Sequence, residues 1–197
     1  MASTKFDIAS AALMLVGASP VSSFSASGTA SQKALNLIYD STLDNWLEIY
    51  NWHFATKTTL MSRIGTAPNT IWSAAYTAPT GMKSLQNVVS GSVGTPILYD
   101  RFENEIHCNA GAAEEVYAVH TYEPSVSEWP GFFVKIMEYA LAQQLSISLV
   151  AKLDMAKVYG DMLDYQYRTA KATDSKQQTT KKLRTSGRGS ILAARRA

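Results

Sequence analysis

Apolar residues near the start of the chain recur at helical spacing, which predicts a first helix over about 5–17. Ser3 or Thr4 is placed to cap its start, and Gly17 marks its end. A second helix is predicted from about Ser31 to Tyr50, where the apolar positions again follow a period of 3.6 residues. The apolar face of this second helix consists of Ala34, Leu35, Ile38, Thr42, Trp46 and Tyr50.

The hydrophobic period changes from helical to alternating in the middle of the chain. Alternation of this kind predicts strands that are buried on one face. Gly, Ser, Thr and Pro are frequent between the alternating pieces, which indicates long loops and short strands. We therefore expect a small antiparallel β-rich insertion over 54–123. The β-prone pieces are 54–60, 72–76, 84–90, 97–99, 105–108 and 116–122.

Two more helices are predicted after the β-rich region. The first, about 131–152, is apolar over most of its circumference, so we expect it to be central to its domain or packed against another subunit. It contains Lys135, Glu138 and Lys152, which makes it a poor membrane span. Asp154 can cap the fourth and last helix, whose helical pattern ends near 172–180. The stripe expected to face the core of that helix is Met155, Val158, Tyr159, Met162, Gln166 and Ala170.

The fold class predicted from these elements is mainly α. Four helices form one bundle, and the small antiparallel β-rich insertion lies between the second and third. The bundle's first half is expected at 1–53 and its second half at 124–174, with the insertion at 54–123. An extended basic arm is expected at 175–197.

Charge is distributed unevenly along the 197 residues. Residues 1–150 contain 7 Lys and Arg against 12 Asp and Glu, whereas residues 151–197 contain 11 against 4. Residues 175–197 carry seven basic side chains and no acidic one. Apolar residues also become sparse after Ala172, so this segment cannot build a core of its own. A basic tail of this kind is typical of segments that bind an acidic protein surface or nucleic acid.

The sequence contains no recognisable catalytic motif. The single cysteine, Cys108, has strand-like neighbours and is interpreted as a packing thiol. His53, His107 and His120 lack the spacing of a metal site, so we expect no metal and no cofactor. We therefore expect that the protein is not an enzyme. The enzymatic alternative is a hydrolase that would need a pocket joining Glu103, Glu105 or Glu114 to His107 or His120.

Several aromatic residues are candidates for core packing or for contacts between subunits, because large aromatic side chains contribute strongly to both. They lie at the end of the second helix and at the start of the third. They are Trp52, Phe54, Trp129, Phe132 and Phe133.

The basic tail contains one apolar pair, Ile191-Leu192, among its charged residues. A nucleic-acid interface would use the arginines on phosphates and would weaken steeply with salt. The tail has no aromatic residue to stack on bases. An apolar pair that enters a groove of a protein partner, flanked by arginine–carboxylate pairs, accounts better for the composition. The candidate binding residues are Lys181, Lys182, Arg184, Arg188, Ile191, Leu192, Arg195 and Arg196.

The order of short motifs resembles the head-to-tail adaptor (connector) proteins of tailed bacteriophages, the group that includes tail tubular protein A of short-tailed phages. The resemblance covers nearly the full chain and depends on the order and spacing of the motifs. They are Ala11-Ala12-Leu13 to Gly17 with Pro20-Val21, Tyr39-Asp40 with Leu43 and Leu47, Trp52-His53-Phe54-Ala55 with Leu60, Trp72 with Ala75-Tyr76 and Pro79, Trp129-Pro130-Gly131-Phe132-Phe133 with Ala140 and Gln144-Leu145, and the terminal Arg195-Arg196.

This resemblance implies a structural protein of the virion. Such adaptors form a ring, a dodecamer, beneath the portal at the capsid–tail junction, and are assembled in the host cytoplasm. The helices would make the ring, the arm would bind the portal protein, and the β-rich part would face the tail nozzle or tail tube. Genomic DNA would pass through the central channel during ejection without specific binding. No contact with a membrane is expected. The alternative function is a nucleic-acid-binding protein that uses the basic arm.

Overall fold

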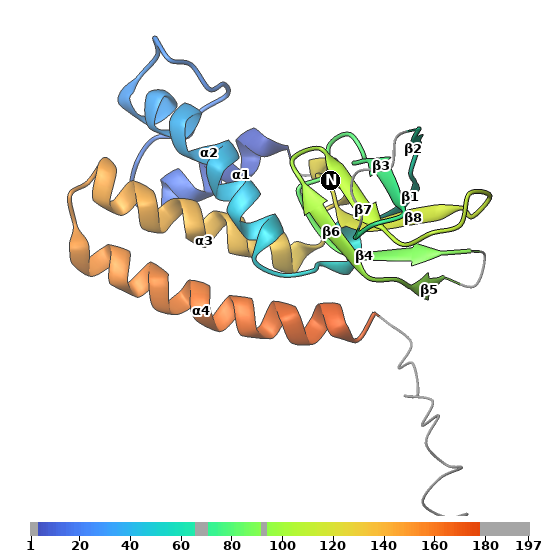
Figure 1. Cartoon of the computed structure of the whole chain (residues 1–197). Helices are drawn as coiled ribbons and strands as arrows, with labels where there is room; N and C mark the ends of the chain where they lie inside the picture. The colour runs from blue at the N-terminus through green and yellow to red at the C-terminus, as the bar shows by residue number, and fades with distance from the viewer. Residues whose placement is uncertain (1–3, 66–70, 92–93, 178–197) are drawn as a thin grey trace, which may run out of the picture.

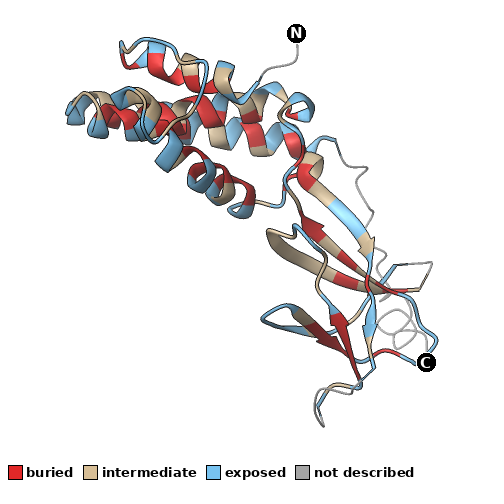
Figure 2. Cartoon of the chain, turned by 90° about the horizontal axis from the view of Figure 1, so that it is seen from above, coloured by how far each residue is buried: buried red, intermediate tan, exposed pale blue. Residues whose placement is uncertain are grey.

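The computed structural model describes residues 4–65, 71–91 and 94–177. Within them the chain forms a helical module at one end of the molecule and a β module at the other (Figure 1). Buried residues gather between the helices and, separately, between the strands (Figure 2). The molecule therefore has two hydrophobic cores, and the chain crosses from one module to the other and back.

The first two helices, α1 (Lys5–Leu15) and α2 (Ala30–Glu48), begin at capping boxes. Thr4 accepts a hydrogen bond from the Asp7 amide, and the Asp7 carboxylate accepts one from the Thr4 amide. Gly17, with a φ of 79°, ends α1, and the Ala18 amide donates back to the Leu13 carbonyl. The expected cap at Thr4 and stop at Gly17 are thus confirmed.

Helix α3 (Gly131–Ser148) lies at the centre of the helical module. It packs against α1 and α2 on one side and against α4 (Leu153–Ser175) on the other (Figure 1). The prediction that this helix is central to its domain is confirmed. Its buried residues occur around most of its circumference and are Phe133, Ile136, Met137, Glu138, Ala140, Leu141, Ala142, Leu145 and Ser146.

The β module contains two four-stranded antiparallel sheets. One has the order β1-β8-β4-β5 and the other the order β2-β3-β7-β6. The strands are β1 (Thr56–Leu60), β2 (Arg63–Ile64), β3 (Ala74–Thr77), β4 (Ser84–Ser90), β5 (Thr95–Pro96), β6 (Tyr99–Phe102), β7 (Glu105–Cys108) and β8 (Val116–Thr121).

Two bent segments, 56–64 and 95–102, each contribute to both sheets. The Met61 amide donates to the Val116 carbonyl of β8, and the next carbonyl, of Ser62, accepts from the amide of Thr77 at the end of β3. In the same way, the Ile97 amide bonds to Val88 of β4 just before β6 pairs with β7. Segments that change sheets form the corners of the module. The eight strands consequently surround one core, which includes the buried thiol of Cys108.

The predicted fold class, a mainly α four-helix bundle with a small β insertion, is wrong. The described residues include eight strands in two sheets, and these form a module with its own core. The helices also do not run side by side as a bundle, because the 11 residues of α1 cannot span the 23 of α4 and α2 crosses α3 obliquely (Figure 1). Most of the predicted β-prone pieces do form strands, but the short strands β2 and β5 were not predicted, and neither were the long-range pairings that join all eight strands around a separate core.

The position of α3 predicts a large loss of stability when its core side chains are shortened. Leu141 is fully buried, so Leu141→Ala should lower the free energy of unfolding by about 2–5 kcal/mol. Ile147 lies on the same helix but is exposed, and Ile147→Ala should change it by less than about 0.5 kcal/mol. Urea unfolding followed by circular dichroism measures both. Equal effects of the two variants would contradict the central placement of α3.

Candidate interaction site at the base of the C-terminal arm

The eight candidate arm residues lie outside the described residues. The base of the arm, however, lies within them, since α4 ends at Ser175 and the described chain continues to Gln177. The candidate site is therefore the anchor of the arm, which we define as the residues that hold the last turn of α4. These residues come from the connection between α2 and β1, more than a hundred positions earlier in the chain.

Asp174 is the central residue of this anchor, and its side chain is completely buried. One carboxylate oxygen lies 2.8 Å from Nδ1 of His53, and the His53 backbone amide donates to both oxygens at 3.1 and 3.2 Å. A buried carboxylate is costly unless such donors satisfy it. Asp174 therefore ties the end of α4 to the start of the short 3₁₀ helix His53–Ala55.

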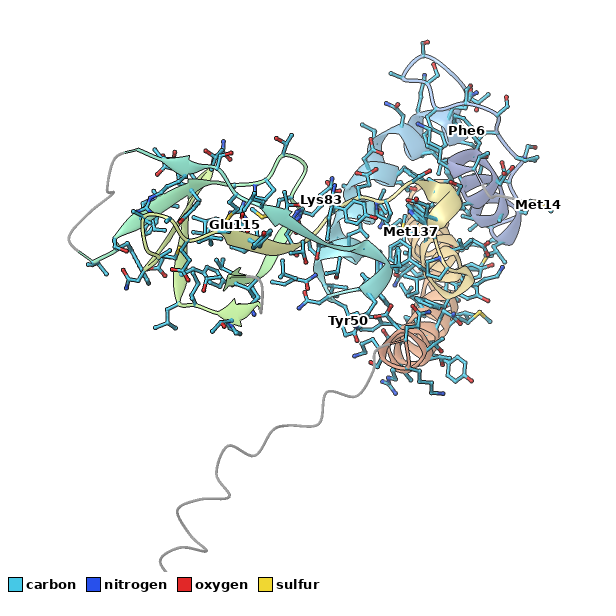
Figure 3. The ribbon with its side chains drawn as sticks, turned by 90° about the vertical axis from the view of Figure 1, so that its right-hand side faces the viewer. Phe6, Met14, Tyr50, Lys83, Glu115 and Met137 are labelled. Atoms are coloured by element: carbon cyan, nitrogen blue, oxygen red, sulfur yellow. The ribbon has the colours of Figure 1, made fainter. Side chains whose placement is uncertain are left out.

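Tyr50 supports the same turn from beside the end of α4 (Figure 3). Its hydroxyl lies 3.2 Å from Oγ of Ser175. Its ring packs on Trp52 with 4.8 Å between centroids. The last helical turn before the basic segment is thus attached at two successive residues, Asp174 and Ser175.

The five aromatic residues singled out in the sequence lie together next to this anchor. Trp52 is fully buried and packs on Phe132 and Phe133, with ring centroids 6.0 and 5.5 Å apart. Phe54 and Trp129 also contact Phe133, at 4.8 and 5.1 Å. The cluster joins the residues that enter the β module to those that leave it. Both indoles are satisfied, because Trp52 Nε1 donates to the Trp46 carbonyl and Trp129 Nε1 to the Pro124 carbonyl.

Tyr167 extends this aromatic cluster to α4. Its ring lies 6.2 Å from Trp52 and 5.4 Å from Trp46. Burial raises the pKa of the Tyr167 hydroxyl, with a smaller contribution from Tyr50. Sequence reasoning identified neither Tyr167 nor Asp174 as a site residue. The one available signal was that Asp174 is the last acidic residue of the chain.

Lys83 connects the two modules on another side of the junction (Figure 3). Immediately before β4, it forms ion pairs with Asp44 of α2 and with Glu123, which follows β8. The hydrogen bond to Asp44 is the main cause that raises the pKa of the Lys83 ammonium. The position of the β module relative to the helices therefore depends on a charged contact as well as on the aromatic cluster.

The histidines and carboxylates considered for catalysis are distributed over the β module. His107 bonds to Glu105 at 2.8 Å on β7, whereas His120 on β8 contacts Thr59 at 3.1 Å in the other sheet. The carboxylate of Glu114 accepts a hydrogen bond from the Gly111 amide, which holds its pKa below the ordinary value. Glu103 lies at a hairpin turn with a φ of 49°.

Two surface hollows lie near these residues, and neither has the composition that the hydrolase alternative requires. One is lined by Glu103 and Glu105 without His107 or His120. The other, at the junction of the modules, is lined by His120, Lys57 and Lys83 without Glu103, Glu105 or Glu114. Among the described residues, no cluster of three His, Cys, Asp or Glu could hold a metal ion. In the same residues, no helix is long and apolar enough to cross a membrane.

Comparison with known proteins gives no match to this chain, either among family models or among curated proteins.

The anchor predicts a local effect of removing the Asp174 carboxylate. Asp174→Ala leaves the His53 amide and imidazole without their acceptor, which should cost about 1–3 kcal/mol of stability. Backbone amides of the last α4 turn should exchange with deuterium faster than in the wild type, while those of α3 keep their protection. Asp164→Ala, an exposed change on the same helix, is the control and should leave the exchange unaltered. Unchanged exchange in Asp174→Ala would contradict the anchor.

The raised pKa of Lys83 predicts an alkaline effect on stability. A lysine whose pKa is higher in the folded state than in the unfolded state contributes fully below its ordinary value of about 10.4. That contribution is lost as the pH rises through the folded-state value. The Tm of the wild type should fall more steeply above about pH 10 than that of Lys83→Met, which lacks the ion pairs at every pH. Parallel Tm curves would show that the pairs contribute nothing.

Proposed function

We propose that this protein is a head-to-tail adaptor of a tailed bacteriophage, a structural virion protein whose C-terminal arm binds the portal protein. Copies of the chain form a ring, a dodecamer, at the capsid–tail junction. The helical module makes the ring, and the β module faces the tail nozzle or tail tube. The channel lets the genome pass without specific binding.

The observation that carries this proposal is the combination of a fixed base and a strongly basic arm. The last turn of α4 is held by Asp174, His53 and Tyr50, so the arm leaves the body from a defined place. Beyond it the sequence has only basic charges together with the pair Ile191-Leu192. An arm with a fixed origin and mixed charged and apolar residues suits binding to a groove on another protein.

The separation into two modules also supports an adaptor. A connecting protein must contact different partners at different ends. Here a helical core and a β core lie at opposite ends of the molecule (Figure 1). Lys83 pairs with Asp44 across the junction, and the aromatic cluster fixes the segments that enter and leave the β module. A rigid junction would transmit the position of one partner to the other.

The alternative is a nucleic-acid-binding protein that uses the arm on phosphates. Its affinity would depend on the number of arginines and lysines and would fall steeply with salt. Ile191 and Leu192 would then contribute little. The two functions therefore make opposite predictions for the apolar pair, and this difference can be measured.

Deleting residues 180–197 should abolish binding to the portal ring of the same virus while the described fold remains. The physical reason is that the deletion removes Ile191-Leu192 and six of the seven basic residues of the arm but none of the core. Co-sedimentation with purified portal rings measures binding, and thermal unfolding shows that the truncated chain is folded. Normal attachment by the truncated chain would refute the arm's role.

Two full-length variants separate the adaptor from its alternative. Ile191→Ser with Leu192→Ser keeps every charge, and Arg195→Ser with Arg196→Ser keeps the apolar pair. The adaptor proposal expects the first variant to lose portal binding at physiological salt. A nucleic-acid-binding protein would instead retain its DNA affinity in the first variant and bind DNA more weakly in the second. Both are tested with portal rings and with duplex DNA at several salt concentrations.

A further inference from the structure

Helix α4 has a second apolar stripe that faces away from its own protein. The side that packs on α3 buries Ala156, Leu163 and Ala170, spaced seven residues apart. A different set recurs at alternating spacings of three and four, the pattern of a two-helix seam. At 100° per residue it lies about 130° around the helix from the buried side. The second set is Met155, Val158, Met162, Tyr165, Thr169 and Ala172.

The large side chains in the middle of this seam are exposed to solvent. Val158, Met162 and Tyr165 retain 50, 44 and 72% of their accessible surface. Next to them lies a shallow, mainly apolar hollow lined by Tyr139, Asp161, Met162, Tyr165 and Gln166. The seam therefore has both protruding side chains and a depression that could receive one.

The charged residues beside the seam favour a second copy of α4 as the partner that covers the seam. Asp161 and Arg168 lie seven residues apart on the same edge of the stripe. If two copies of α4 pack antiparallel with Met162 opposite the partner's Tyr165, Asp161 of each copy faces the partner's Arg168. The same alignment sets Met155 opposite the partner's Ala172, a large residue against a small one. Within the described residues, neither Asp161 nor Arg168 forms an ion pair.

We propose that α4 binds α4 of a second copy of this chain, antiparallel, through this seam. Two Asp161–Arg168 pairs flank it by symmetry, and the two Tyr165 side chains enter the two hollows. The contact is twofold, whereas a ring needs head-to-tail contacts. The pair is therefore a state of the free protein, and it does not rest on the proposed function.

The register predicts a specific pattern among charge variants. Asp161→Arg and Arg168→Asp each set like charges against each other, so each should raise the dimer dissociation constant about tenfold or more. The double variant exchanges the two charges and should dimerise like the wild type. A mixture of the two single variants should also form a mixed dimer, because the two arginines of one chain then face the two aspartates of the other. Sedimentation velocity at several protein concentrations measures each case.

A second pair of variants tests the apolar seam itself. Met162→Asp places a carboxylate in the seam and should abolish the dimer. Leu153→Asp changes an apolar residue of α4 that is also exposed to solvent but lies off the seam, and it should leave the dimer intact. Circular dichroism checks that both variants are folded, as expected for exposed positions. Equal effects of the two changes would overturn the proposal.

Other occupants of the seam give different outcomes. A full-length protein that is monomeric at every concentration overturns the proposal. If the full chain is monomeric but a chain ending at residue 177 dimerises, the arm covers the seam instead, which also overturns it. A dimer that forms with and without the arm supports the proposal. Portal binding is measured separately, so the two proposals can fail independently.

Discussion

The contact of Trp52 with Phe132 and Phe133 is the interaction on which the arrangement of the molecule depends. Trp52 belongs to the segment that enters the β module, and the two phenylalanines begin α3, soon after the chain leaves it. Aromatic pairs of this kind add about 0.5–1.5 kcal/mol each beyond the burial of their area. Because Tyr167 of α4 joins the same cluster, these aromatic contacts fix the segment that enters the β module, the segment that leaves it, and the last helix.

The anchor at Asp174 follows from that arrangement. His53 immediately follows Trp52, so the packing of the indole presents the His53 amide and imidazole to the end of α4. Asp174 meets them as a buried carboxylate, which is stable only with its donors in place. The strongly basic residues of the chain follow directly. If the protein is an adaptor, this anchor defines the point from which each arm reaches its partner.

Local signals predicted the parts of the fold that depend on neighbouring residues. Thr4 and Gly17 were identified as a cap and a stop because capping needs only a few adjacent positions. The central position of α3 followed from apolar residues around most of its circumference. The bent strands could not be predicted in this way, because the change from β8 to β3 partners along 56–64 depends on residues far away in the sequence.

The predicted core stripe of α4 shows a second limit. The predicted stripe correctly included Tyr159 and Ala170, which pack in the helical core, but it also favoured Met155, Val158 and Met162, whereas the structure buries Ala156 and Leu163. Small alanines let the helices approach closely, and periodicity alone cannot tell which of two apolar stripes faces inward. The partner of Asp174 was likewise unpredictable, since His53 lies 121 positions earlier.

Electron microscopy of portal rings mixed with the full-length protein tests the central claim most directly. The account predicts a ring of copies beneath each portal, with the β modules pointing away from it and density for 178–197 running from the end of α4 onto the portal. Portal rings that remain bare, or rings of this protein attached through the β module, would contradict the account.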